Sequence, residues 1–133
     1  MDDTDNLSFP KFSFIELRVN DLDQAVLWYQ RVFGLLPIFE DKKTRFVLLN
    51  RGSFSLALKE KESRLPSVTP EDSIQKKWLL AFEVEDLTSE QTRLQSLGLE
   101  LKTEYHQSSE GYHQIRISDL DGNLITIYSW KKS

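Results

Sequence analysis

The chain carries one short pattern twice, and the second copy begins 65 residues after the first, at Leu79 instead of Phe14. The copies are residues 14–22, FIELRVNDL, and residues 79–87, LLAFEVEDL. In each copy apolar and polar residues alternate, as they do in a half-buried strand. Each copy ends in Asp-Leu, where the Asp side chain can cap a helix. A helical stretch follows each copy and ends at Gly34 or Gly98. A repeat of this length indicates one supersecondary unit used twice to build a shared structure.

The sequence after each copy predicts three further strands. In the first half we expect a helix from Asp21 to Gly34 and strands near 12–19, 35–40, 44–50 and 53–59. In the second half we expect a helix at 87–97 and strands near 78–84, 99–104, 112–118 and 123–130. The Asp121-Gly122 pair between two alternating runs is a strong hairpin signal. Each half therefore reads βαβββ.

The expected organisation is one domain made of two modules. The first module covers residues 12–60 and the second covers 78–133, after a flexible arm at 1–11. Residues 61–77 are polar and contain two prolines, which is typical of a linker.

Composition excludes several kinds of chemistry and partner. The 133 residues include no cysteine, which excludes disulfide bonds and thiolate chemistry. A net charge of -4 without a run of Lys or Arg argues against nucleic acid and anionic membranes as partners. The acidic start, MDDTD, lacks the features of a signal peptide, and no apolar run is long enough to span a membrane. We therefore expect a cytoplasmic location.

Three segments together resemble the vicinal oxygen chelate superfamily, which includes glyoxalases, bleomycin-resistance proteins and extradiol dioxygenases. They are residues 14–22, Trp28-Tyr29 followed by Phe33-Gly34, and residues 119–125, DLDGNLI. The resemblance covers about residues 12–130. It implies an α+β fold in which two tandem βαβββ modules form an open, curved mixed sheet around a concave cavity, with helices on the outer face. It also implies a homodimer, because relatives commonly pair and sometimes exchange modules.

Metal-dependent members of that superfamily hold a divalent ion with His, Glu or Gln from the first and last strands of each module. The resemblance places these positions at Phe14, Leu79, Thr126 and Ala57, or Leu56 if one turn is tighter. Stable sites need three or four imidazole, carboxylate or thiolate ligands, which these residues do not provide. We therefore expect no metal and no other cofactor, as in the metal-free branch whose members bind drugs or metabolites.

Strand parity predicts further cavity residues. If the apolar positions of each first strand pack on a helix, the intervening side chains face the cavity. These are Phe14, Glu16 and Arg18 in the first module and Leu79, Ala81 and Glu83 in the second. The other expected ligand-binding residues are Ala57, Tyr112, Arg116, Thr126 and Tyr128.

Glu16 and Glu83 are the candidate catalytic residues. We expect them to occupy equivalent places and to converge in a half-dry cleft, as a base or as an anionic pair. The alternative is that each carboxylate is solvated, or paired with Arg18 or Arg116.

Two histidines flank a Ser-Ser-Glu-Gly loop. This loop is either a lid, with Tyr112, His106 or His113 touching ligand, or an exposed hairpin connection. Trp28 and Tyr29 lie on an amphipathic helix, which predicts a place in the core.

Three functional hypotheses remain. The first is a metal-free protein that binds a small planar or cationic molecule, with Phe14 and Tyr128 stacking and the two glutamates supplying charge. The second is a lyase, isomerase or dioxygenase-type enzyme that uses Glu16 or Glu83 as a base or as an unconventional metal ligand. The third is an assembly or regulatory module whose cavity has decayed.

Overall fold

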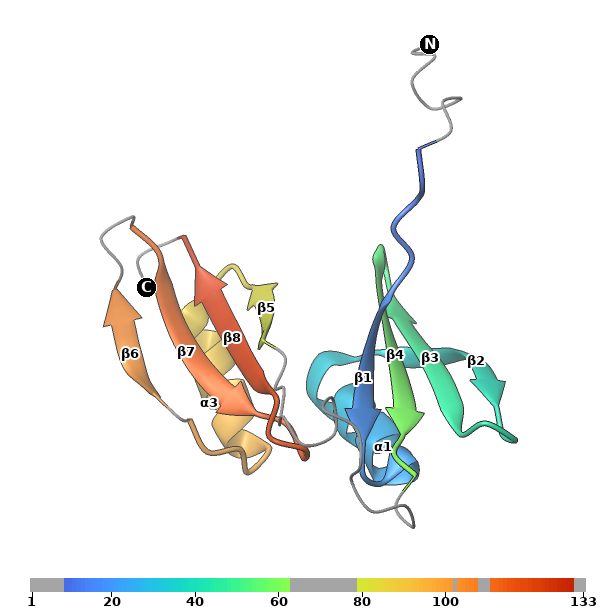
Figure 1. Ribbon diagram of the computed structural model, residues 1–133. Coiled ribbons are helices and arrows are strands. Elements are labelled where there is room, and N and C mark those ends of the chain that lie inside the picture. The colour runs from blue at the N-terminus through green and yellow to red at the C-terminus, as the bar shows by residue number, and fades with distance from the viewer. Residues whose placement is uncertain (1–8, 63–78, 102, 108–110, 131–133) are drawn as a thin grey trace, which may run out of the picture.

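Two successive modules make up the computed structural model, which describes residues 9–62, 79–101, 103–107 and 111–130 (Figure 1). The first contains β1 (Ile15–Val19), α1 (Leu22–Phe33), β2 (Leu36–Asp41), β3 (Phe46–Arg51) and β4 (Phe54–Glu60). The second contains β5 (Leu79–Glu83), α3 (Leu87–Ser96), β6 (Thr103–Gln107), β7 (His113–Ser118) and β8 (Leu124–Ser129). The predicted α+β fold of two βαβββ modules is confirmed. No described helix has the length and apolar character needed to cross a membrane.

Each module forms a four-stranded mixed sheet. The strand orders are β1-β4-β3-β2 and β5-β8-β7-β6, so the two sheets have the same topology. In both, the first strand runs parallel to the last, and the remaining pairs are antiparallel. Within the described residues no strand pairing joins one sheet to the other.

One strand boundary was predicted wrongly. The strand expected at 99–104 is β6, which begins at Thr103. Leu99 and Leu101 instead belong to the connection after α3, and both pack half-buried against the core. Their alternation reflects this packing and not strand pairing. The predicted linker at 61–77 and the arm at 1–11 lie mostly outside the described residues.

The helices begin at the two Asp-Leu pairs, as expected. The Asp21 carboxylate accepts a hydrogen bond from the backbone N–H of Gln24, and Asp86 accepts from Thr88 and Ser89. Each Asp therefore satisfies N–H groups that the first helical turn leaves without partners. After α1, Gly34 has φ 69°, a left-handed conformation that favours glycine.

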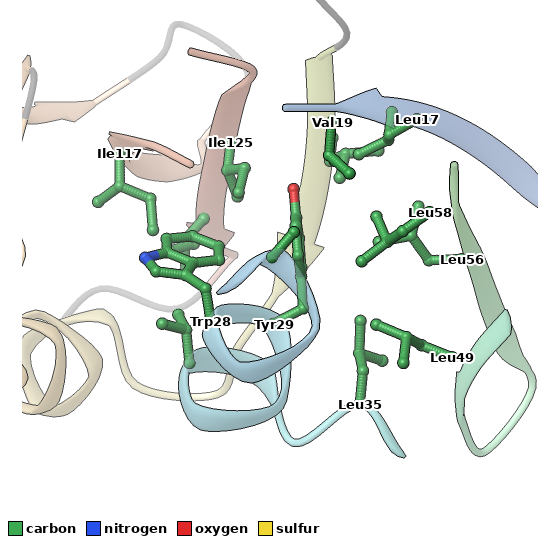
Figure 2. Close-up of a cluster of buried hydrophobic side chains, with 14 of the residues drawn as sticks. Leu17, Val19, Trp28, Tyr29, Leu35, Leu49, Leu56, Leu58, Ile117 and Ile125 are labelled. Atoms are coloured by element: carbon green, nitrogen blue, oxygen red, sulfur yellow. The ribbon is translucent and has the colours of Figure 1, made fainter. Parts of the chain in front are cut away.

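Helix α1 contributes to a core shared by both modules. Figure 2 shows Trp28 pointing towards Ile117 and Ile125 of the second module, while Tyr29 lies beside Val19. Trp28 is 6% exposed and Tyr29 is 1% exposed, as expected for core residues. At the end of the helix, the Phe33 ring stacks on Phe82 of β5 with centroids 4.1 Å apart. The helix thus packs on its own sheet and against the second module.

A buried hydrogen bond also joins the modules. The Tyr29 hydroxyl donates to Asp119 Oδ2 at 2.5 Å. Burial, followed by the charge of Asp119, raises the pKa of Tyr29, so the phenol remains a donor. Asp119 also accepts from the backbone N–H groups of Asp121 and Asn123 and from the Asn123 side-chain amide. Beside this contact, the Asn20 N–H donates to Asp121 Oδ1 at 2.8 Å. The turn between β7 and β8 is therefore held by the same carboxylate that binds α1.

Replacing Tyr29 with Phe should lower the free energy of unfolding by about 1–3 kcal/mol, because a buried carboxylate loses a donor. The measurement is urea denaturation. Tyr128→Phe is the control, since that hydroxyl donates to Glu83 over 3.4 Å at an exposed site, and it should cost less than about 0.5 kcal/mol. Equal losses in the two variants would contradict a special role for Tyr29.

Candidate functional site

Each sheet has one face packed on helices and one open face. In β1, Leu17 and Val19 are fully buried, while Arg18 between them is exposed. In β5, Leu80 is buried, whereas Leu79 is 57% exposed. The predicted parity therefore holds in both modules. The side chains expected at the site from these two strands lie on the open faces.

A cavity of about 360 Å³ lies on the open face of the second sheet. Six of the predicted ligand-binding residues line it: Leu79, Ala81, Tyr112, Arg116, Thr126 and Tyr128. Gln114 and Trp130 also line it, and sequence reasoning missed both. The signal was available, because Gln114 alternates with Tyr112 and Arg116 along β7, and Trp130 continues the alternation of β8.

Strand register places the polar groups of this cavity side by side. Thr126 of β8 lies opposite Ala81 on one side and opposite Arg116 on the other. Directly opposite residues on one face of a sheet have neighbouring side chains. Ala81, Thr126 and Arg116 therefore form one row across the sheet, with the small Ala81 side chain leaving room above it.

An aromatic cluster stands next to this row. The rings of Tyr112, Tyr128 and Trp130 meet edge to face, with centroids 5.5–6.0 Å apart. Such edge-to-face packing holds aromatic rings in defined orientations. The cavity thus has an aromatic side and a polar row.

Two polar atoms of that row are buried without a hydrogen-bond partner. They are Thr126 Oγ1 and Arg116 Nε, as far as the described residues go. Thr126 is only 6% exposed. A buried hydroxyl without a partner costs free energy, so the site favours a molecule that can hydrogen-bond there.

The predicted site residues of the first module lie on the other sheet. Phe14, Glu16 and Arg18 are on or beside β1, and Ala57 lies opposite Glu16 but is fully buried. Phe14 packs edge to face on Phe46 at 6.0 Å. None of them lines the cavity of the second sheet. Within one chain, the predicted site residues are therefore split between two different sheets.

The expectation that Glu16 and Glu83 occupy equivalent places is wrong. Glu16 lies opposite Ala57 in β4, and Ala81 lies opposite Thr126 in β8, so Glu16 corresponds to Ala81 and not to Glu83. Glu16 instead forms an ion pair with Arg18, with 3.2 Å between Glu16 Oε2 and Arg18 Nε. This pairing is the alternative considered from the sequence. Glu83 accepts a hydrogen bond from Tyr128 at 3.4 Å. Neither the cavity of the second sheet nor a second one between the modules is lined by both carboxylates.

The donor set does not fit the divalent metal found in metal-dependent members. Of the four corresponding residues, Phe14 and Ala57 lie in the first module, and Leu79 and Thr126 lie in the second. Thr126 offers one neutral hydroxyl, and the other three side chains have no donor atom. Among the described residues, no group of three or more His, Cys, Asp or Glu could hold a metal ion.

The predicted lid lies partly outside the described residues. His113 is 3% exposed and lies on the helix-covered face of β7, so it does not reach the cavity, whereas the adjacent Tyr112 does. The His106 side chain and residues 108–110 lie outside the described residues.

A larger cavity, of about 630 Å³, lies where the modules meet. Its charged lining is already partly paired, because Arg93 donates to Glu90 and to the Val32 carbonyl oxygen. The end of α1 forms one side, and the negative end of the helix dipole disfavours an anion there. The smaller cavity is the better candidate site, because its buried polar atoms lack partners.

Comparison with known proteins identifies the family. A family model described as the Glyoxalase/Bleomycin resistance protein/Dioxygenase superfamily matches residues 11–127. The chain belongs to this superfamily. It is 28% identical to the uncharacterized protein YraH of Bacillus subtilis over 120 residues, which is 86% of this chain and 94% of YraH.

Solved structures of other proteins have a similar fold. TioX from Micromonospora sp. ML1 matches with a TM-score of 0.72 and 20% identity over 91% of this chain and 100% of TioX. The fosfomycin resistance protein FosX from Listeria monocytogenes, in a complex with Mn(II) and sulfate, matches with a TM-score of 0.70 and 19% identity. That match covers 91% of this chain and 90% of FosX. At these identities the likeness shows the fold alone.

Replacing Thr126 with Val should leave the free energy of unfolding of the ligand-free protein unchanged within about 0.5 kcal/mol, or raise it, because the hydroxyl has no described partner. Ser129→Ala is the matched control on β8. Its buried hydroxyl donates to the Glu85 carbonyl oxygen at 3.0 Å, and its loss should cost about 1 kcal/mol. Chemical denaturation measures both. A larger loss for Thr126→Val than for Ser129→Ala would contradict the unpartnered state.

Proposed function

We propose that this protein binds a small organic molecule in the cavity on the open face of the second sheet, without a divalent metal. The observation that carries the proposal is the row of Ala81, Thr126 and Arg116, in which two buried polar atoms lack a described partner. The row includes Thr126, one of the positions at which metal-dependent relatives hold their ion. A ligand group takes the place of the metal there.

The lining supports an organic ligand. Binding sites for small molecules are typically about 300–1,000 Å³ in volume and combine apolar walls with a few polar groups. The cavity of about 360 Å³ lies at the lower end of that range. Its rings come from Tyr112, Tyr128 and Trp130, which offer flat surfaces to a planar molecule.

A homodimer would complete the site. In one copy the cavity is open to solvent, and the other predicted lining residues lie on the first sheet. That first module also exposes apolar side chains: Leu36, Ile38 and Phe39 of β2 are each more than half exposed. Exposed apolar clusters of this kind mark interaction surfaces. In the proposed dimer, the first sheet of one copy covers the cavity of the other.

Replacing Phe39 with Glu should raise the dimer dissociation constant at least about tenfold, because a charge would be buried in the interface. Leu27→Glu is the control, since Leu27 is 59% exposed on α1, away from the open face. Analytical ultracentrifugation measures both. A monomeric wild type, or equal weakening by the two variants, would contradict the proposed dimer.

The alternative is an enzyme of the same superfamily, a lyase, isomerase or dioxygenase. The observation in its favour is the Tyr128–Glu83 hydrogen bond, which places a carboxylate next to a residue that lines the cavity. Glu16, in contrast, is paired with Arg18. An enzyme using Glu83 as its base would convert a bound molecule, and Glu83→Gln would stop conversion while leaving binding intact. A binding protein returns its ligand unchanged.

The binding proposal is tested by a fragment screen with ligand-observed NMR. Ala81→Trp should weaken the fragments that bind by at least about tenfold, because the indole would fill the cavity from an exposed strand position. Leu27→Trp, on the exposed side of α1, should leave their affinity unchanged. Fragments that bind Ala81→Trp as tightly as the wild type would place the site elsewhere.

A further inference from the structure

We propose that the ligand of this cavity is an aromatic acid, a planar ring that carries a carboxylate, with the carboxylate held by Arg116 and Thr126. This inference rests on the proposed binding function and adds the chemical class of the ligand. It replaces the cationic ligand expected from the sequence.

The charge of the lining favours an anion. Of the described residues that line the cavity, Arg116 alone is charged, and none carries a carboxylate. Its Nε is buried and has no described partner, and none of the described ion pairs includes Arg116. A guanidinium N–H that is buried without an acceptor costs free energy, and the planar donors of a guanidinium match the two acceptor oxygens of a carboxylate. An anionic ligand would supply the missing partner.

Thr126 adds a second donor at the right place. It lies directly opposite Arg116 on the neighbouring strand, so one small group can contact both side chains. Its hydroxyl is buried without a described acceptor. A carboxylate has two oxygens, each of which accepts more than one hydrogen bond. One oxygen can accept from Arg116 Nε–H while the other accepts from the Thr126 hydroxyl.

The aromatic cluster fits the rest of such a molecule. Tyr128 is two residues along β8 from Thr126, on the same face, and its ring contacts Tyr112 and Trp130. A planar ring attached to the carboxylate would therefore lie against these rings. Offset and edge-to-face contacts of this kind add affinity beyond the buried area.

The glutamates do not offset this charge. Glu83 lies outside the lining of this cavity and accepts the Tyr128 hydroxyl hydrogen bond. If a second copy covers the cavity, Glu16 arrives with Arg18 as an ion pair of zero net charge. Arg116 remains the unbalanced charge of the site in either case.

The test compares three probes that share one ring system: 2-naphthoate, 2-naphthamide and 2-naphthylmethylamine, which are anionic, neutral and cationic at pH 7. Isothermal titration calorimetry should show 2-naphthoate binding at least about tenfold more tightly than 2-naphthamide, and the amine most weakly. Arg116→Gln should remove the preference, so that 2-naphthoate binds about as weakly as 2-naphthamide does to the same variant. Arg31→Gln, which removes an exposed charge from α1, is the control and should preserve the preference.

The outcomes separate this inference from the binding proposal. If the three probes bind the wild type with equal affinity and do not bind Ala81→Trp, the cavity is the binding site but the inference of an aromatic acid is overturned. Tighter binding of the amine would overturn it in favour of the cationic ligand. A preference for 2-naphthoate that persists in Arg116→Gln would also overturn it. If no probe binds, both the inference and the binding proposal fail for planar molecules of this size.

Discussion

The hydrogen bond between Tyr29 and Asp119 is the contact on which the arrangement of this chain depends. Asp119 holds the turn between β7 and β8 through three donors and accepts a fourth hydrogen bond from α1. Trp28, the neighbour of Tyr29, brings an indole into the second module's core (Figure 2). A buried carboxylate needs its donors, so the turn, the helix and the junction between modules are stabilised together. This arrangement buries the helix-covered face of each sheet in the hydrophobic core.

The site follows from the faces that remain open. With Ile115, Ile117, Ile125 and Ile127 buried, the intervening residues of β7 and β8 line a cavity. Metal-dependent members of the superfamily would place ligands there, whereas this chain has an unpartnered hydroxyl beside a guanidinium. Both groups donate hydrogen bonds, whereas the guanidinium has no electron pair for a metal ion and one neutral hydroxyl is a poor metal ligand. We therefore propose an organic anion, and not a cation, as the ligand of this site.

Much of this could be predicted from the sequence, because the repeat and its alternation are local signals. They predicted the two βαβββ modules, the helix caps, and the parity that places six expected residues around one cavity. The equivalence of Glu16 and Glu83 was wrong although the 65-residue repeat itself aligns Glu16 with Ala81, as the strand register also shows. The division of the site between two sheets depends on how the modules pack, through distant contacts such as Tyr29–Asp119. No local pattern encodes those contacts.

The most direct test of the central claim, an organic ligand in place of the metal, is the metal content of the untagged protein. Elemental analysis would follow incubation with Ni, Zn, Mn or Fe(II) and removal of unbound ions. We expect less than about 0.1 metal ion per chain with each metal, because Phe14, Ala57, Leu79 and Thr126 do not form a ligand set. A value near one ion per chain would contradict the account, since other residues would then have to form a metal centre.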